Sequence, residues 1–111
     1  MSKQSLVTMA RSELAAARGA ASGRSTHAIR GGPEHSLKHI LVALTAGNGL
    51  DDHKAPGDAT LQVLVGRVRL SAGEQTCEGT TDDLMDIPPV VHSLHAIDDS
   101  VVLLTISVTR S

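Results

Sequence analysis

Residues 47–66 read GNGLDDHKAPGDATLQVLVG, and this stretch changes character halfway along. Its first half holds small residues, aspartates and a single histidine, His53, whereas its second half is a short apolar run closed by Gly66. Clusters of Gly, Pro and Asp are typical of loops, and a short aliphatic run bounded by them predicts a buried strand. The stretch poses a question about His53: it is either part of a metal site or a polar residue on the wall of a β-structure.

Short apolar runs between turn residues continue through the rest of the chain from Ser25 onward. Five of them predict strands: ATLQVLVG (59–66), RVRLSAG (67–73), DLMDIPP (83–89), VHSLHAI (91–97) and SVVLLTISVTR (100–110). A further run, STHAIR, precedes the turn GGPE, and the segment 36–47 fits either a helix or a buried strand. Gly66 predicts a tight turn that joins a hairpin. Short strands at regular spacing predict an all-β sandwich or barrel.

The segment before these runs has a different period. In residues 5–20, SLVTMARSELAAARGA, apolar side chains recur at helical spacing, with Ser5 as the expected N-cap and Gly19 as the expected stop. We therefore expect a short N-terminal helical arm over residues 1–24 and a barrel domain over residues 25–111. The arm is expected to pack on the barrel or on a second subunit, and a role as an assembly or regulatory contact is an alternative.

The amino-acid composition argues against one class of function, nucleic-acid binding. The chain has 111 residues, no Phe, Tyr or Trp, and a net charge of −2. Nucleic-acid binding usually needs stacking aromatic rings or a basic surface, so we expect none. A core built without aromatic side chains must gain its stability from many aliphatic contacts, and burial in a homodimer would add to them.

The lone cysteine and the absence of long apolar runs bear on location. Cys77 cannot form an internal disulfide, and it stands between two glutamates that disfavour the thiolate. No apolar run approaches the roughly 18 residues of a membrane helix, and no signal peptide is visible. We expect a cytoplasmic protein without membrane contact.

With these strands in place, residues 36–109 resemble a small single-domain cupin of the RmlC-like type. The first motif of that family is a glycine, five residues, His-x-His, then a glutamate and a closing glycine. Gly47, His53 and Gly66 match it in register, and His92 in IPPVVH matches the histidine that follows the second motif's turn. The resemblance implies a jelly-roll barrel, or double-stranded β-helix, that commonly forms dimers.

The resemblance also implies a metal held by three histidines and a glutamate inside the barrel, and here two of the four ligands are missing. The second histidine falls on Ala55, and the glutamate falls on Ala59 or Thr60. His53 and His92 alone make a weak site for a divalent transition metal, because such ions want three or more protein ligands. The two histidines are then either partial metal ligands or hydrogen-bonding residues of a pocket.

Other residues could rebuild the site. His39 is a candidate third metal ligand if its strand face turns inward, and Asp51 lies two residues before His53, on the same side of an extended chain. His95 is three residues from His92 and should face the opposite way. If the family's register holds, the inward wall carries aliphatic residues that would line a ligand pocket: Ala59, Leu61, Val63 and Val65.

Two functions of different classes follow. The first is a non-enzymatic homodimeric barrel that binds a small molecule or serves structurally, with an incomplete metal site for which a divalent transition metal is the candidate cofactor. The alternative is a metal-dependent cupin enzyme, of the dioxygenase or isomerase type, that uses a rebuilt histidine site. No nucleophile elbow and no glycine-rich phosphate loop occurs in the sequence.

Overall fold

The computed structural model describes residues 1–108, and in that range the apolar runs form strands around a common core. The elements follow in the order α1 (Leu6–Gly19), β1 (Arg24–Arg30), β2 (Leu37–Leu44), β3 (Gly49–His53), β4 (Asp58–Val65), β5 (Arg67–Ala72), β6 (Gln75–Thr80), β7 (Leu84–Ile87), β8 (His92–Ala96) and β9 (Ser100–Ser107). The segment 36–47, which the sequence left open between helix and strand, is mostly strand β2. The end of the predicted last strand, residues 109–110, lies outside the described residues, as does the end of the predicted barrel domain.

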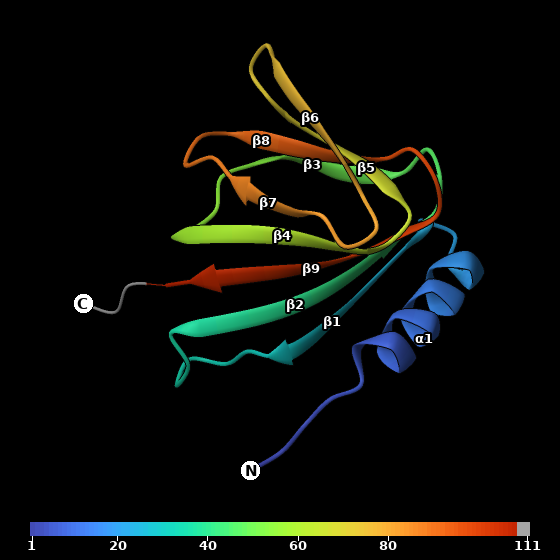
Figure 1. Ribbon diagram of the computed structural model, residues 1–111, viewed down its shortest axis with the longest axis vertical. Coiled ribbons are helices and arrows are strands. Elements are labelled where there is room, and N and C mark those ends of the chain that lie inside the picture. Colours follow the sequence, from blue (N-terminus) through green and yellow to red (C-terminus); the bar gives the residue numbers. More distant parts are fainter. Residues whose placement is uncertain (109–111) are drawn as a thin grey trace.

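The strands make two antiparallel sheets that face each other. One sheet has the order β1-β2-β9-β4-β7 and the other the order β3-β8-β5-β6 (Figure 1). Consecutive strands repeatedly change sheet, as β4 and β5 do, which is the connectivity of a jelly roll. The predicted all-β jelly roll with a short N-terminal helix is therefore confirmed.

The prediction of a hairpin at Gly66 is wrong. β4 pairs with β7 and β9, whereas β5 pairs with β6 and β8, so Gly66 lies at a corner where the chain crosses from one sheet to the other. Gly66 has a φ of 96°, and a Cβ there would overlap the carbonyl oxygen of Asp99 and the side chain of Ser100. Glycine is required at this corner for both reasons, and a tight hairpin turn and a tight corner look alike in sequence.

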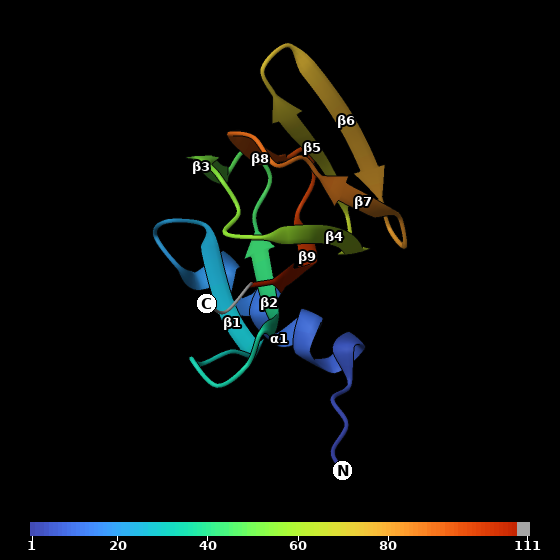
Figure 2. The ribbon, with the colours of Figure 1, turned by 90° about the vertical axis from the view of Figure 1, so that its left-hand side faces the viewer.

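Two strands were not predicted, and both are rich in polar residues. β3 carries two aspartates, and β6 exposes all of its residues except Gly79. The pairings of β6 are made with β5 alone, and the β5–β6 hairpin rises away from the rest of the barrel (Figure 2). Neither strand has the buried aliphatic pattern by which the others were recognised.

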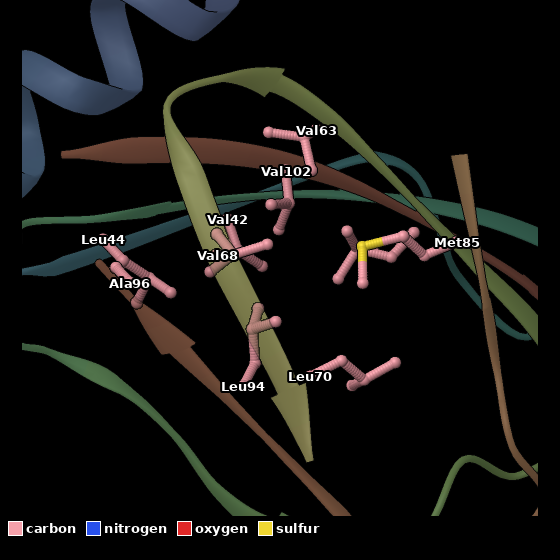
Figure 3. Packing of buried hydrophobic residues seen from close by; sticks show 10 residues of the cluster. Val42, Leu44, Val63, Val68, Leu70, Met85, Leu94, Ala96 and Val102 are labelled. Carbon is pink, nitrogen blue, oxygen red and sulfur yellow. The ribbon is translucent and has the colours of Figure 1, made fainter. Parts of the chain in front are cut away.

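The interior between the sheets is filled by aliphatic side chains from both of them (Figure 3). One cluster combines residues of β2, β4, β7 and β9 with residues of β5 and β8: Val42, Leu44, Leu61, Val63, Val68, Leu70, Met85, Leu94, Ala96 and Val102. The register stacks them in layers along the barrel, because Val42 and Val63 both pair with Val102, and Leu61 pairs with Leu104. We call this set the inner cluster.

The outer face of the five-stranded sheet is covered by α1. Ser5 caps the helix by accepting a hydrogen bond from the Thr8 amide, as expected, although the helix runs through Gly19 to a C-cap at Ala20. Ala10, Leu14 and Ala17 of the helix pack on Leu41, Ala43 and Val101 of the sheet. β9 is thus buried on both faces, and the outer cover comes from the chain's own helix, which lies along β1 and β2 in Figure 1.

Val65, which was expected to face the barrel interior, faces outward. The pairing of β4 with β9 shifts between Val63 and Val65, so that Leu64 is the extra residue. A β-bulge of this kind reverses the alternation of side chains beyond it. As a result, Leu64 packs with the outer cluster and Val65 is 39% exposed, so the prediction that Val65 lines the interior is wrong.

Candidate functional site

His53 and His92 lie beside each other at one end of the barrel interior. They are direct partners across the β3–β8 pairing, and their ring centroids are 4.5 Å apart with the planes tilted by 59°. His92 is buried, at 3% exposure, whereas His53 is exposed. The pair therefore spans from the interior to the surface, and we call this end of the barrel the mouth.

Each ring makes the same hydrogen bond with the backbone just before it in the chain. Nδ1 of His92 lies 2.9 Å from the carbonyl oxygen of Val90, and Nδ1 of His53 lies 2.9 Å from the carbonyl oxygen of Asp51. In both cases the acceptor belongs to the residue two positions earlier. Such bonds orient an imidazole and leave Nε2 as the nitrogen that can act on a ligand.

An apolar cavity of about 70 Å³ opens next to the pair. Of the twelve residues that line it, two are the histidines and ten are apolar: Leu50, Ala55, Pro56, Ala59, Leu61, Leu70, Ile87, Leu94, Leu104 and Ile106. Ala59 pairs with Ile106 and with Ile87, so it belongs to the layer at the mouth. The cavity exists where the side chains at 55 and 59 end at Cβ.

The predicted pocket residues are placed as follows. Ala59 and Leu61 line the cavity. Val63 faces the same interior but lies deeper, where it is fully buried in the inner cluster and does not reach the cavity. Leu50, Pro56 and Ile106 line the cavity as well, and the sequence reasoning had not singled them out.

His39 is not brought to the pair. Its strand neighbour Ile40 packs on the inner cluster, whereas Leu41 packs under α1, and His39 shares the parity of Leu41. Nδ1 of His39 lies 3.1 Å from the hydroxyl of Thr105 on the same outer face. The expected third ligand is therefore on the far side of the sheet from His53 and His92.

Asp51 does not join the pair either. The β3–β8 register shifts between Leu50 and His53, so the simple alternation from Asp51 to His53 is interrupted. Asp51 and Asp52 instead line an open surface groove with Ser93 and His95. His95 is exposed on the face of β8 opposite to His92, as predicted.

These positions show whether the residues present could hold the divalent metal that the resemblance implies. Within residues 1–108, no three His, Cys, Asp or Glu side chains lie close enough together to hold a metal ion. Of the described residues, those that line the cavity offer two imidazoles and no carboxylate. The donor set therefore does not fit a cupin metal centre of three histidines and a glutamate.

Charged groups gather on the outer face of the four-stranded sheet instead. Glu78 on β6 binds Arg67 at 2.8 Å and Arg69 at 3.0 Å across the β5–β6 pairing. Hydrogen bonds from these guanidinium groups lower the pKa of the Glu78 carboxyl and raise that of Arg67. These pairs are solvent-exposed, and among the described residues no Asp, Glu, Lys or Arg side chain lines the cavity.

Comparison with known proteins adds the fold family. No family model and no curated protein matches the sequence. Among solved structures, a conserved protein of unknown function from Streptococcus pyogenes superposes with a TM-score of 0.73 at 18% identity, over 83% of this chain and 80% of that one. A cupin superfamily protein from Desulfitobacterium hafniense has a TM-score of 0.71 at 14% identity, over 78% of each chain.

A third similar structure has the same architecture. A cupin-like protein from Thermotoga maritima superposes with a TM-score of 0.67 at 23% identity, over 77% of this chain and 68% of that one. At such identities the similarity concerns the fold and carries no activity with it. No helix among the described residues is long and apolar enough to span a membrane. The two sheets, their connectivity and these superpositions together identify the chain as a small protein with the RmlC-like cupin fold.

Proposed function

We propose that this protein is a small-molecule-binding cupin barrel in which the His53–His92 pair recognises the ligand. The observation that carries the proposal is the composition of the cavity at the mouth: ten apolar residues and two imidazoles oriented by their own backbone. Ligand pockets generally combine an apolar wall with a few polar groups in fixed positions. At about 70 Å³ the cavity suits a very small molecule, because drug-sized ligands occupy roughly 300–1,000 Å³.

The accessibility of the cavity is tested first, with xenon as the probe. Xenon enters dry apolar cavities through dispersion alone, without any hydrogen bond. We expect saturable shifts of methyl NMR signals from Leu61, Leu104 and Ile106, and no such shifts in an Ala59→Leu variant whose side chain fills the cavity. If xenon leaves these methyl groups unaffected in the unmodified protein, the proposal is wrong.

The alternative function is a metal-dependent cupin enzyme with a rebuilt histidine site. The backbone hydrogen bonds of both Nδ1 atoms favour it, because metal-binding histidines are commonly oriented in this way. Against it stand the two missing ligands and the position of His39 on the outer face. Elemental analysis of protein purified without added metal or chelator distinguishes the two functions. More than about half a metal ion per chain, lost in a His53→Ala variant, would support the enzyme.

We also propose that the protein is a homodimer. Leu37 and Leu84 have the parity of the outer face of the five-stranded sheet, and they are 43% and 67% exposed. Their burial between two copies would supplement an aliphatic core that has no aromatic residues. Sedimentation equilibrium is expected to show a dimer, and a Leu37→Ser/Leu84→Ser variant a monomer. A monomer for the unmodified chain would contradict this proposal.

A further inference from the structure

The tautomer of both histidines at the mouth is set by the backbone. A carbonyl oxygen can only accept a hydrogen bond, so the carbonyls of Asp51 and Val90 require a proton on Nδ1 of His53 and His92. A neutral imidazole carries one proton, which leaves a lone pair on Nε2 of each ring. Both neutral rings therefore present a hydrogen-bond acceptor and no further donor.

The Nε2 atom of His92 reaches open space although the residue is almost entirely buried. Within the described part of the chain this atom has no hydrogen-bond partner, and no fully enclosed side-chain nitrogen or oxygen of residues 1–108 is left without one. Nε2 of His92 is thus not sealed inside the protein. The space that His92 lines is the apolar cavity, so an acceptor is available there.

The other lining side chains cannot supply a donor. All ten are aliphatic or proline side chains. A ligand that offers only acceptors, such as a carbonyl compound, would leave its own polar atom unpaired in this cavity, and an unpaired buried polar group is costly. A carboxylate or phosphate would in addition be a buried charge without a cation.

The volume limits the ligand further. About 70 Å³ is several times smaller than the roughly 300–1,000 Å³ of pockets that take drug-sized ligands. Such a space holds a compact molecule of a few non-hydrogen atoms.

We propose that the mouth of the barrel selects compact neutral molecules that carry a hydroxyl group, with the hydroxyl donating to Nε2 of His92 and the alkyl part in the apolar cavity. His53, at the exposed side of the pair, provides a second acceptor beside the first. This inference rests on the proposed function, because it names the class of ligand that the same pocket takes.

The test compares two probes of the same size, propan-2-ol and acetone. Both have four non-hydrogen atoms, but the alcohol can donate a hydrogen bond and the ketone cannot. Each is titrated into the protein at pH 8, where an ordinary histidine is neutral, with a chelator present to remove trace metal. Methyl signals of Leu61 and Ile106 and the ring signals of His92 report binding by NMR.

We expect propan-2-ol to bind at least about 10-fold more tightly than acetone, because the ketone cannot pair with the imidazole acceptor. In a His92→Leu variant, which keeps an apolar wall, this preference should disappear, so that the two probes bind about equally while xenon still binds. His53→Leu, at the exposed position, is the second variant and remains informative if His92→Leu does not fold. It should reduce the preference by a smaller factor.

The outcomes separate the two proposals. If xenon binds and the two probes bind equally, the selectivity for a hydroxyl group is wrong and the pocket itself stands. If acetone is preferred, the assigned tautomer is wrong. If neither the probes nor xenon affect the methyl signals, the cavity is not accessible, and the proposed function fails together with this inference.

Discussion

The two ends of the barrel are built from the same strands, yet one end is filled and the other is hollow. At the filled end, Val42, Val63 and Val102 form one layer, and each is at most 3% exposed. One layer further along, Leu61 and Leu104 already line the cavity, and in the next layer the corresponding positions hold Ala59 and Ile106, which line it as well. The pairing of β4 with β9 is continuous between these layers, and the small side chain of Ala59 in place of a valine leaves space at the mouth.

This comparison bears on how the cavity at the mouth differs from the metal site that the resemblance implies. The two small residues at the mouth, Ala55 and Ala59, occupy the positions where the resemblance places a histidine and a glutamate. Both line the cavity. The space that ligating side chains would fill is available to a small molecule instead, and the two remaining histidines keep the orientation that their backbone carbonyls give them.

The largest expected effect comes from restoring the missing ligands. An Ala55→His/Ala59→Glu variant should bind Ni²⁺ or Zn²⁺ at least ~1,000-fold more tightly than the unmodified protein, because complete four-ligand sites contribute about 10–16 kcal/mol. Isothermal titration calorimetry measures this affinity. Adding His92→Ala should abolish most of the gain. Unchanged affinity in the first variant would show that positions 55 and 59 do not converge with the histidines.

The next largest effect is the loss of unfolding free energy when a leucine is shortened to alanine at each end of the barrel. Leu44 is fully buried in the inner cluster, and Leu44→Ala should cost about 2–5 kcal/mol of unfolding free energy. Leu50 is half-buried and borders the cavity, so Leu50→Ala should cost about 1–2 kcal/mol, since less contact is lost there. Urea denaturation measures both. Equal costs at the two positions would mean that the mouth is packed as tightly as the filled end.

Replacing an alanine by a valine should lower the stability of the protein at the filled end and raise it at the mouth. Ala96 is fully buried in the inner cluster, so Ala96→Val forces two extra carbons into a packed layer and should destabilise the protein by about 1–3 kcal/mol. Ala59→Val places them in the cavity and should stabilise it by about 0.5–1.5 kcal/mol. The midpoints of thermal or urea unfolding give both signs. A loss of stability in Ala59→Val would argue against an empty cavity.

Much of the fold could be predicted from the sequence because the pattern that carries it is local. The strands with a buried aliphatic face, the helix with its Ser5 cap and the jelly-roll class are all confirmed. Strands β3 and β6 were missed because their side chains are polar and mostly exposed. Gly66 was assigned to a hairpin because a corner between sheets needs the same glycine conformation.

The site was harder to predict, because facing direction depends on bulges that a sequence pattern does not show. The resemblance to small cupins brought His53 and His92 into consideration, and the structure places them side by side. The bulge in β4 turns Val65 outward, and the register shift in β3 separates Asp51 from His53. His39 follows simple alternation, but the choice between its inner and outer face depends on which side α1 covers.

The smallest expected effect concerns an ion pair at the filled end between α1 and the turn before β9. Asp99, in the turn before β9, accepts a hydrogen bond from the Ala46 amide at 2.8 Å and pairs with Arg18 of α1 at 3.0 Å. The Ala46 amide and then the Arg18 guanidinium lower the pKa of the Asp99 carboxyl in the folded state. Its contribution to stability is therefore present above the unfolded pKa of about 3.9 and is lost as the pH falls through the lower folded value.

An Asp99→Asn variant should accordingly be less stable than the unmodified protein at pH 7, by an amount that salt reduces because both partners are solvent-exposed. The difference should shrink as the pH falls below about 4 and the carboxylate is protonated. Urea midpoints at pH 7, 4 and 3 measure this trend. Asp52→Asn at the mouth is the matched control, since Asp52 makes no ion pair among the described residues, and it should leave the midpoint unchanged at each pH. A pH-independent difference for Asp99→Asn would mean that the loss lies in packing of the turn and that the charge on Asp99 does not help to hold α1 to the filled end.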